Sequence, residues 1–235
     1  MPRPGGRSSV PRGLAQFPAR HGERNAGRKF HWEKMIDVTL PGNIQIIQHE
    51  DSILVINNVF LEDYLACVSV AEMSHSCPSE FLKCQTIAAR SWILAGTEKK
   101  HIDLGIDACS DDCCQRYQGL EQQNPHSHSA VKSTHGTVLI YENEICDARY
   151  SKSCGGVTES CENVWDMKPK PYLKSIFDGT EKIDSIDWEN WFSNIIDSFC
   201  SSKFIDENTI SNYLGSVDQK KKYFRWNVQF TQNEF

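Results

Sequence analysis

The first residue that could take part in a reaction is Glu72, an acid that ends an apolar helical segment. The side chains just before it include Val68, Val70 and Ala71, and we expect them to surround the carboxyl group. A carboxyl removed from water holds its proton more tightly, so its pKa rises toward the range that a general acid needs at neutral pH. The alternative is a solvated acid at a helix end. The first interpretation makes Glu72 a proton donor to a bond that is being broken.

A second group with possible chemistry is a run of cysteines in a polar segment. Cys109, Cys113 and Cys114 lie close together there. The chain has 10 Cys, more than cytosolic proteins normally use and fewer than small disulfide-rich domains use. Free thiols or a disulfide would explain the group, and the adjacent Cys113 and Cys114 favour oxidation outside the cytoplasm.

A hairpin and two helices are expected to position Glu72. Residues 44–48 and 52–57 are rich in β-formers and flank a polar turn, which predicts a hairpin. Helical spacing begins at Leu61, with acids in the first turn where the helix dipole favours them. Pro78 then starts a second helix that runs to Gly96. The cysteines of these helical segments are expected to be small buried apolar side chains: Cys67, Cys77 and Cys84.

The cysteines lie in a long polar segment, residues 97–128, which predicts a functional or disordered loop. Residues 137–141 and 145–150 predict a second hairpin. It is followed at once by Gly155 and Gly156, which allow a sharp turn or the close approach of a ligand to the backbone.

The two ends of the chain differ from its middle. Residues 1–29 are rich in Pro, Gly and Arg, carry a net charge of about +6 and are expected to be a disordered tail. Residues 188–200 predict a helix. Residues 223–231 alternate like a strand so close to the end that the last elements of the domain are expected to be missing. Residues 30–235 then form one domain around one core.

Charge argues against nucleic acid as a partner, and hydropathy argues against a transmembrane segment. With a net charge of −6 overall, the chain after residue 29 is acidic, which argues against nucleic acid as a partner. No stretch reaches the roughly 18–20 apolar residues that cross a bilayer, so no transmembrane segment is expected. Residues 1–29 also lack the apolar core of a secretory signal, and we expect a soluble chain.

Four blocks of sequence, in this order, resemble the sporulation stage II protein D / LytB family, which includes the amidase enhancer proteins and acts on bacterial cell-wall peptidoglycan. The resemblance extends from about Phe30 to the C-terminus. The blocks are LEDYL…AEM (residues 61–73), CSDDCCQRYQG (109–119), ICDARYSKSCGGVTES (145–160) and ENVWDMKPKPYLKSI (162–176). Four blocks at compatible spacing form a specific match.

The resemblance implies an α+β fold in which antiparallel β-hairpins pack with a helix pair around a substrate cleft. It also implies a lytic transglycosylase with Glu72 as its acid. Such an enzyme cleaves the bond between N-acetylmuramic acid and N-acetylglucosamine and leaves 1,6-anhydro ends. One carboxyl suffices because the muramyl 6-hydroxyl is the nucleophile, unlike in two-carboxylate glycosidases.

The resemblance assigns further roles near Glu72. It implies a structural zinc ion held by His101, Cys109 and Cys114, because thiolate and imidazole suit zinc; Cys113 is a competing ligand. Candidate glycan contacts are Tyr117 as a stacking platform and the serine and glycine segment that follows Tyr150: Ser151, Ser153 and Gly155. A plain glycine turn is the alternative for that segment, and no motif of a nucleophilic serine is present.

Two other functions compete with the enzyme. One is a non-catalytic wall-binding module that enhances a cell-wall amidase, and the other is a zinc-loop interaction domain without a role at the wall. Fold alone does not separate them. The family resemblance implies that the chain lies in the cell envelope or elsewhere outside the cytoplasm, with peptidoglycan glycan strands as its expected partner. Arg90 is expected to join the helix pair, and His126, His128 and His135 to lie on the surface.

Overall fold

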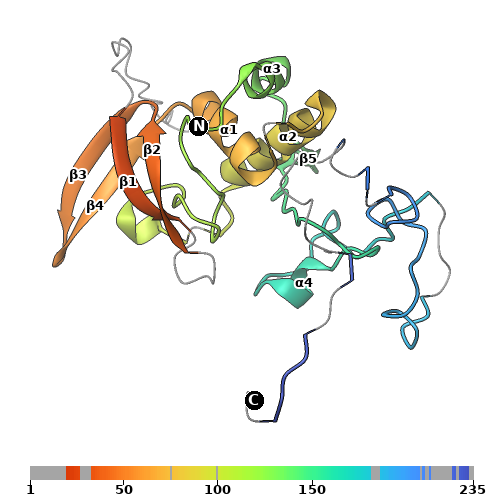
Figure 1. Cartoon of the computed structure of the whole chain (residues 1–235). Helices are drawn as coiled ribbons and strands as arrows, with labels where there is room; N and C mark the ends of the chain where they lie inside the picture. The colour runs from red at the N-terminus through yellow and green to blue at the C-terminus, as the bar shows by residue number, and fades with distance from the viewer. Residues whose placement is uncertain are drawn as a thin grey trace, which may run out of the picture.

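The computed structural model describes residues 20–26, 33–74, 76–98, 100–180 and 186–206, with short pieces beyond them at 208–209, 212, 224–225 and 228–232. Figure 1 shows strands β1 to β4 at the left, helices α1 to α3 in the centre and the blue C-terminal segments at the right. The elements in chain order are β1 (Arg20–Ala26), β2 (Lys34–Leu40), β3 (Asn43–His49), β4 (Ser52–Asn58), α1 (Leu61–Glu72), α2 (Ser79–Ala95), the 3-10 helix η1 (Ile102–Leu104), α3 (Pro125–Ser133), β5 (Ile140–Tyr141), β6 (Glu144–Ile145) and α4 (Cys161–Val164).

Antiparallel pairs make up the strands of the described chain. The hairpin predicted around residue 50 is confirmed, because β3 pairs with β4 from Asn43 opposite Asn58 to His49 opposite Ser52. Strand β1 pairs with β2 along its full length. The disordered segment predicted for residues 1–29 is therefore wrong for residues 20–26. These polar residues lack the apolar alternation of a strand, so the sequence does not predict β1. Backbone hydrogen bonds to β2 hold it in the strand conformation. Residues 1–19 and 27–29 lie outside the described residues.

Both predicted helices are confirmed. Helix α1 begins at Leu61 with Glu62 and Asp63 in its first turn, as the dipole favours. Helix α2 follows Pro78 and ends at Gly96, whose φ of 54° is the left-handed conformation that favours glycine. The pair forms the frame on which Glu72 is placed, at the C-terminal end of α1.

The core lies where α1 meets α2 and α3. One cluster of buried side chains surrounds Leu65 and Val68 of α1 and includes Ala89, Tyr117 and Val131. A second cluster surrounds Val70 and Leu82. Of the cysteines predicted to be buried, Cys67 and Cys77 are, whereas Cys84 is exposed on α2.

Several other predictions need correction. Helix α3 begins inside the loop predicted for residues 97–128, with Asn124 as a capping-box residue and Pro125 in the first turn. The second hairpin is limited to β5 and β6, joined by Glu142 and Asn143, both with positive φ. Residues 188–200 form turns and bends instead of a helix.

The α+β fold class is confirmed by this mixture of helices and small antiparallel sheets. Of the predicted strand at 223–231, residues 223, 226 and 227 lie outside the described part, and residues 228–231 have no regular structure. Among the described helices, none combines the length and apolar character needed to span a membrane.

Candidate functional site

The carboxyl group of Glu72 is held by the loop that follows the cysteines. The backbone N–H of Arg116 donates a hydrogen bond of 2.7 Å to Glu72 Oε1. The Tyr150 hydroxyl also hydrogen-bonds to this side chain. Two elements distant in sequence thus converge on one carboxyl group, and they orient it without a charged partner within hydrogen-bond distance in the described chain.

Burial raises the pKa of Glu72 above its usual value of 4.5, although the hydrogen bonds from Arg116 and Tyr150 lower it in part. Val68, Val70 and Ala71, which precede Glu72 in α1, are buried. A carboxyl group in these surroundings can hold a proton at a higher pH than a solvated one and release it when a base is generated nearby. The role of Glu72 as a general acid stays a prediction.

A line of buried polar groups continues from Tyr150 into the core. Gln115, which is 1% exposed, donates from Nε2 to Tyr150 Oη at 3.4 Å and to the Ala89 carbonyl at 3.3 Å. Its Oε1 accepts a 3.0 Å hydrogen bond from the Tyr64 hydroxyl. Burial raises the pKa of Tyr150 well above its usual value. Tyr150 therefore stays protonated and acts as a hydrogen-bond donor toward Glu72.

The cysteine loop brings four potential metal ligands together. The ligand atoms of His101, Cys109, Cys113 and Cys114 all lie within 4.8 Å of one another. Cys109 Sγ is 2.9 Å from Cys113 Sγ, and Cys113 Sγ is 4.0 Å from His101 Nε2. Three sulfurs and one imidazole nitrogen are a donor set that suits a closed tetrahedral zinc site. Cys113, considered only as a competitor of Cys114, lies inside the cluster with it.

The three thiols of this cluster have pKa values shifted in different directions. Hydrogen bonding, first from Cys114 and then from Cys113 and His101, lowers the pKa of Cys109 to about 4. Burial and the neighbouring Cys109 raise the pKa of Cys113. The hydrogen bond with Cys109 raises the pKa of Cys114. Cys109 is thus the thiol of this loop that ionises first.

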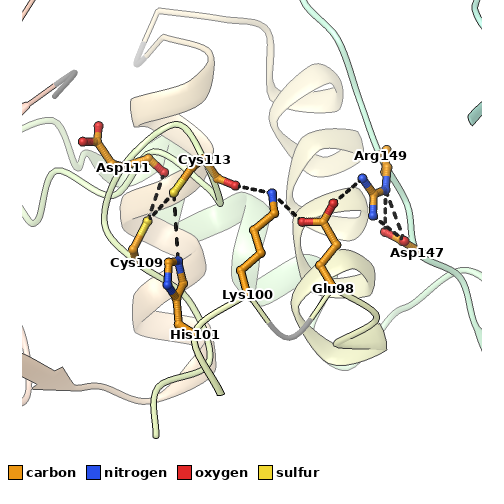
Figure 2. Close-up of polar contacts among 8 residues, drawn as sticks. All are labelled: Glu98, Lys100, His101, Cys109, Asp111, Cys113, Asp147 and Arg149. Atoms are coloured by element: carbon orange, nitrogen blue, oxygen red, sulfur yellow. Dashed lines mark hydrogen bonds and ion pairs between the residues drawn. The ribbon is translucent and has the colours of Figure 1, made fainter. Parts of the chain in front are cut away.

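A chain of ion pairs joins the cysteine loop to the rest of the site. Figure 2 shows that Lys100 reaches the Cys113 carbonyl, at 2.8 Å, and also pairs with Glu98. Glu98 in turn pairs with Arg149, which binds the buried carboxylate of Asp147 at 3.0 Å. Because Arg149 precedes Tyr150 in sequence, this network fixes the cysteine loop and the Tyr150 segment relative to each other.

Of the predicted glycan contacts, Tyr117 is not available as a stacking platform. Its side chain is 5% exposed, stacks on Tyr64 with ring centroids 5.2 Å apart and donates a 2.6 Å hydrogen bond to Asn57 Oδ1. Its aromatic ring fills the core between α1 and β4. The prediction is therefore corrected, since an aromatic residue next to a polar loop satisfies the core first.

The serine and glycine segment is accessible and continues directly from Tyr150. Ser151 is exposed, and Ser153 and Gly155 are half-buried. Gly155 has a φ of 65°, and its carbonyl accepts a 2.7 Å hydrogen bond from Arg225 Nη1. The pocket lined by Trp92, Gly96 and Cys114 does not include Glu72, so the cleft expected at Glu72 is not that pocket.

Arg90 joins the helix pair as expected, and the three loop and helix histidines are exposed as expected: His126, His128 and His135. Sequence reasoning missed the role of Tyr150 and of the Arg116 amide. Tyr150 had a signal, because it opens the serine and glycine segment. A backbone amide has no signature in the residue types, so only the folded loop reveals it.

Comparison with known families gives two matches along the chain. A family model described as Stage II sporulation protein matches residues 49–141. That range contains Glu72, the cysteine loop and Arg116. A second model, described as a domain of unknown function, matches residues 159–235. Tyr150 and the serine and glycine segment lie between the two matched ranges.

Three curated relatives match over parts of their length. An uncharacterized protein of Brachyspira hyodysenteriae is 33% identical over 135 residues, which cover 57% of this chain and 36% of that protein. The Amidase enhancer of Bacillus subtilis is 37% identical over 102 residues, 43% of this chain and 13% of its own length. Stage II sporulation protein D of Bacillus subtilis is 30% identical over 135 residues, 52% of this chain and 39% of its own length. The chain thus spans well under half of each relative.

Proposed function

We propose that this chain, whose residues 49–141 match a family model described as Stage II sporulation protein, acts on bacterial cell-wall peptidoglycan as a lytic transglycosylase. Its substrate is the glycan strand. The bond that breaks joins N-acetylmuramic acid to N-acetylglucosamine, and the product carries a 1,6-anhydro end. The observation that carries this proposal is the half-buried, hydrogen-bonded carboxyl of Glu72 with its raised pKa.

The proposed mechanism needs only one carboxyl group. Protonated Glu72 donates its proton to the glycosidic oxygen as the bond to the muramyl anomeric carbon breaks. The resulting carboxylate then takes the proton from the muramyl 6-hydroxyl, whose oxygen attacks the anomeric carbon and closes the 1,6-anhydro ring. Glu72 ends the cycle protonated, and no water is consumed. The Arg116 amide and the Tyr150 hydroxyl stabilise the carboxylate between the two steps.

Glycan strands are proposed to lie along the segment next to Tyr150. Ser151 and Ser153 offer hydroxyl groups, and Gly155 offers a backbone that a sugar can approach closely. Each follows Tyr150 within five positions, and Tyr150 contacts Glu72. The proposal places a bound sugar beside Tyr150, on the side of the proton donor. These residues bind and orient the substrate, and Glu72 carries the chemistry.

We also propose that the cysteine cluster of His101, Cys109, Cys113 and Cys114 holds one zinc ion. Its sulfur and nitrogen donor set supports this assignment. The ion is structural and would fix the loop conformation. Arg116, whose amide binds Glu72, follows Cys114 by two residues. The cluster therefore supports the position of the catalytic carboxyl group from a distance.

A second candidate function is a wall-binding module that enhances a cell-wall amidase. The observation that favours it is the 37% identity with a relative named Amidase enhancer. This role needs glycan binding and a partner enzyme but no proton transfer from Glu72. Both candidate functions belong at the cell wall, so the expected location is the cell envelope.

Digestion of purified glycan strands, followed by mass analysis of the ends, separates the two functions. The parent chain is expected to produce 1,6-anhydro ends, and Glu72→Gln to produce none. Glu80→Gln, which alters an exposed acid of α2, is the matched control and should cleave like the parent. Strands that are bound but never cleaved by the parent would reject the transglycosylase and favour the enhancer.

A further inference from the structure

A second cluster of metal-ligating side chains lies away from the cysteine loop. The ligand atoms of Cys154, Asp178 and Cys200 all lie within 4.8 Å of one another. Cys154 Sγ is 3.4 Å from Asp178 Oδ2 and 3.5 Å from Cys200 Sγ. All three residues are half-buried. They come from three segments separated by more than 20 residues each, so the fold gathers them.

Backbone hydrogen bonds tie the three segments together at this point. The Asp178 N–H donates to the Gly156 carbonyl at 2.9 Å, and the Phe199 N–H donates to the Asp178 carbonyl at 2.8 Å. Gly156 has a φ of 107°. This φ favours glycine, and a Cβ at Gly156 would also lie 2.4 Å from Ile196 Cδ1, so a larger residue would have to displace that side chain. The ligand geometry therefore rests on the backbone as well as on side chains.

The distances match a tetrahedral zinc site. With Zn–S bonds of about 2.3 Å and a Zn–O bond of about 2.1 Å, two sulfurs lie roughly 3.8 Å apart and a sulfur and an oxygen roughly 3.6 Å apart. The two measured distances, 3.5 and 3.4 Å, differ from these values by only a few tenths of an ångström. Two thiolates favour zinc over the hard cations magnesium and calcium.

The surroundings also suit bound thiolates. The Gly156 N–H points to Cys154 Sγ at 3.4 Å, and Ser198 Oγ, which is buried, lies 3.7 Å from Cys200 Sγ. Such outer hydrogen bonds orient metal ligands. Arg225 binds the Gly155 carbonyl, and its buried Nη2 has no hydrogen-bond partner among the described residues. Zinc with two thiolates and a carboxylate carries one net negative charge, which this guanidinium would balance.

We infer that Cys154, Asp178 and Cys200 form a second zinc site, with a water molecule as the fourth ligand. This ion is distinct from the one proposed for the cysteine loop. It joins the segment around Cys200 to the loop of Ser153 and Gly155. The Cys200 segment lies within the range of the second family match. The site thereby fixes the proposed glycan-binding segment from its far end.

The test uses the full chain purified under reducing conditions with zinc, and it measures metal by elemental analysis. The cysteine loop is disabled by replacing Cys109, Cys113 and Cys114 with Ser. That variant is expected to keep about one zinc ion per chain, and adding Cys154→Ser or Cys200→Ser should remove it. Cys84→Ser, which alters an exposed thiol outside both clusters, is the matched control. Equal zinc content with and without Cys154 and Cys200 would overturn the inference.

A measurement on the unaltered chain decides the question if the cysteine variants fail to fold. Alkylation of native protein followed by peptide mapping should show Cys154 and Cys200 protected with zinc present and modified after chelation. Asp178→Asn should weaken zinc binding by more than the about 10- to 100-fold that loss of an outer partner costs. A peptide that links Cys154 to Cys200 through a disulfide, or equal alkylation before and after chelation, would contradict the zinc site.

Discussion

The guanidinium of Arg90 on α2 makes two hydrogen bonds to the carboxylate of Glu62 on α1, one of 3.0 Å from Nε and one of 2.6 Å from Nη2. Its third nitrogen donates to the Thr137 carbonyl at 3.0 Å. The Arg90 side chain is 1% exposed, against 25% for Glu62. One buried cation thus joins both helices to the chain that leads into β5.

Removing the carboxylate of this pair should be costly. Glu62→Gln leaves the buried Arg90 charge uncompensated, and we expect a loss of about 3 kcal/mol in the free energy of unfolding. The matched control is Glu80→Gln, which breaks the exposed pair with Lys83 and should cost no more than about 1 kcal/mol. Denaturant unfolding of both variants measures the difference. Similar losses for the two would refute the structural role of Arg90.

Glu72→Gln should reduce glycan cleavage by at least the about 10²- to 10⁴-fold that general acid catalysis contributes. The amide keeps the size of the side chain and still accepts the hydrogen bond from the Arg116 N–H, so binding to glycan strands should persist. Rates of release of 1,6-anhydro ends and strand binding are measured side by side. Parent-like turnover by this variant would eliminate the catalytic role.

The same substitution should stabilise the fold in a pH-dependent way. Because burial raises the pKa of Glu72 above 4.5, the unfolded chain loses the proton first as the pH rises, and the folded state loses stability through that window. Glu72→Gln should therefore have a higher thermal midpoint than the parent at neutral pH. The difference should vanish below about pH 4, where the carboxyl is protonated in both states. A constant difference across pH would show that ionisation is not its cause.

Tyr150→Phe should move the pH profile of cleavage. The Tyr150 hydroxyl lowers the pKa of Glu72, so its removal should shift the alkaline limb of activity, where Glu72 loses its proton, to higher pH. Tyr141→Phe in the exposed β5–β6 hairpin is the control and should leave the limb unchanged. A profile with only its height reduced would mean that Tyr150 does not act on the ionisation of Glu72.

Each cysteine of the loop should contribute to metal binding. Cys109→Ser, Cys113→Ser and Cys114→Ser are each expected to lower the zinc content by up to about one ion per chain and to lower the thermal midpoint, because a structural ion stabilises only the folded state. Cys113→Ser is the informative variant, since the structure places its sulfur 2.9 Å from Cys109 Sγ. Full zinc content in that variant would mean that Cys113 is not a ligand, and that Cys109 and Cys114 are the thiolate ligands of the loop.

The parts of the fold that could be predicted are those whose pattern is local. Leu61 and Pro78 mark the beginnings of α1 and α2 through helical periodicity, acids and a proline. Asn124 and Pro125 carry an equally local signal for α3 that the long polar segment obscured. By contrast, the helix expected at 188–200 fails because its groups bind elsewhere. The Phe199 N–H bonds to the Asp178 carbonyl, and Arg225 lies over the Trp191 ring.

The candidate site divides in the same way. The acid Glu72 and the cysteine loop are visible in residue types and spacing. The contact that orients Glu72 is not, because it comes from a backbone N–H, at Arg116, that any residue except proline could supply. Tyr117 has the residue type of a sugar platform, yet the space between α1 and β4 takes its ring into the core. Long-range packing decides such cases.

The ionised carboxyl group of Glu72, at the end of α1, lowers the stability of the fold, because burial makes its charged form costly. A mutation to glutamine keeps its shape and its contact with Arg116. Selection for stability alone would therefore discard this acid, and a lineage that needed only to bind glycan could lose it without harm to the scaffold. If Glu72 is the proton donor proposed above, the fold gives up stability for activity at this position.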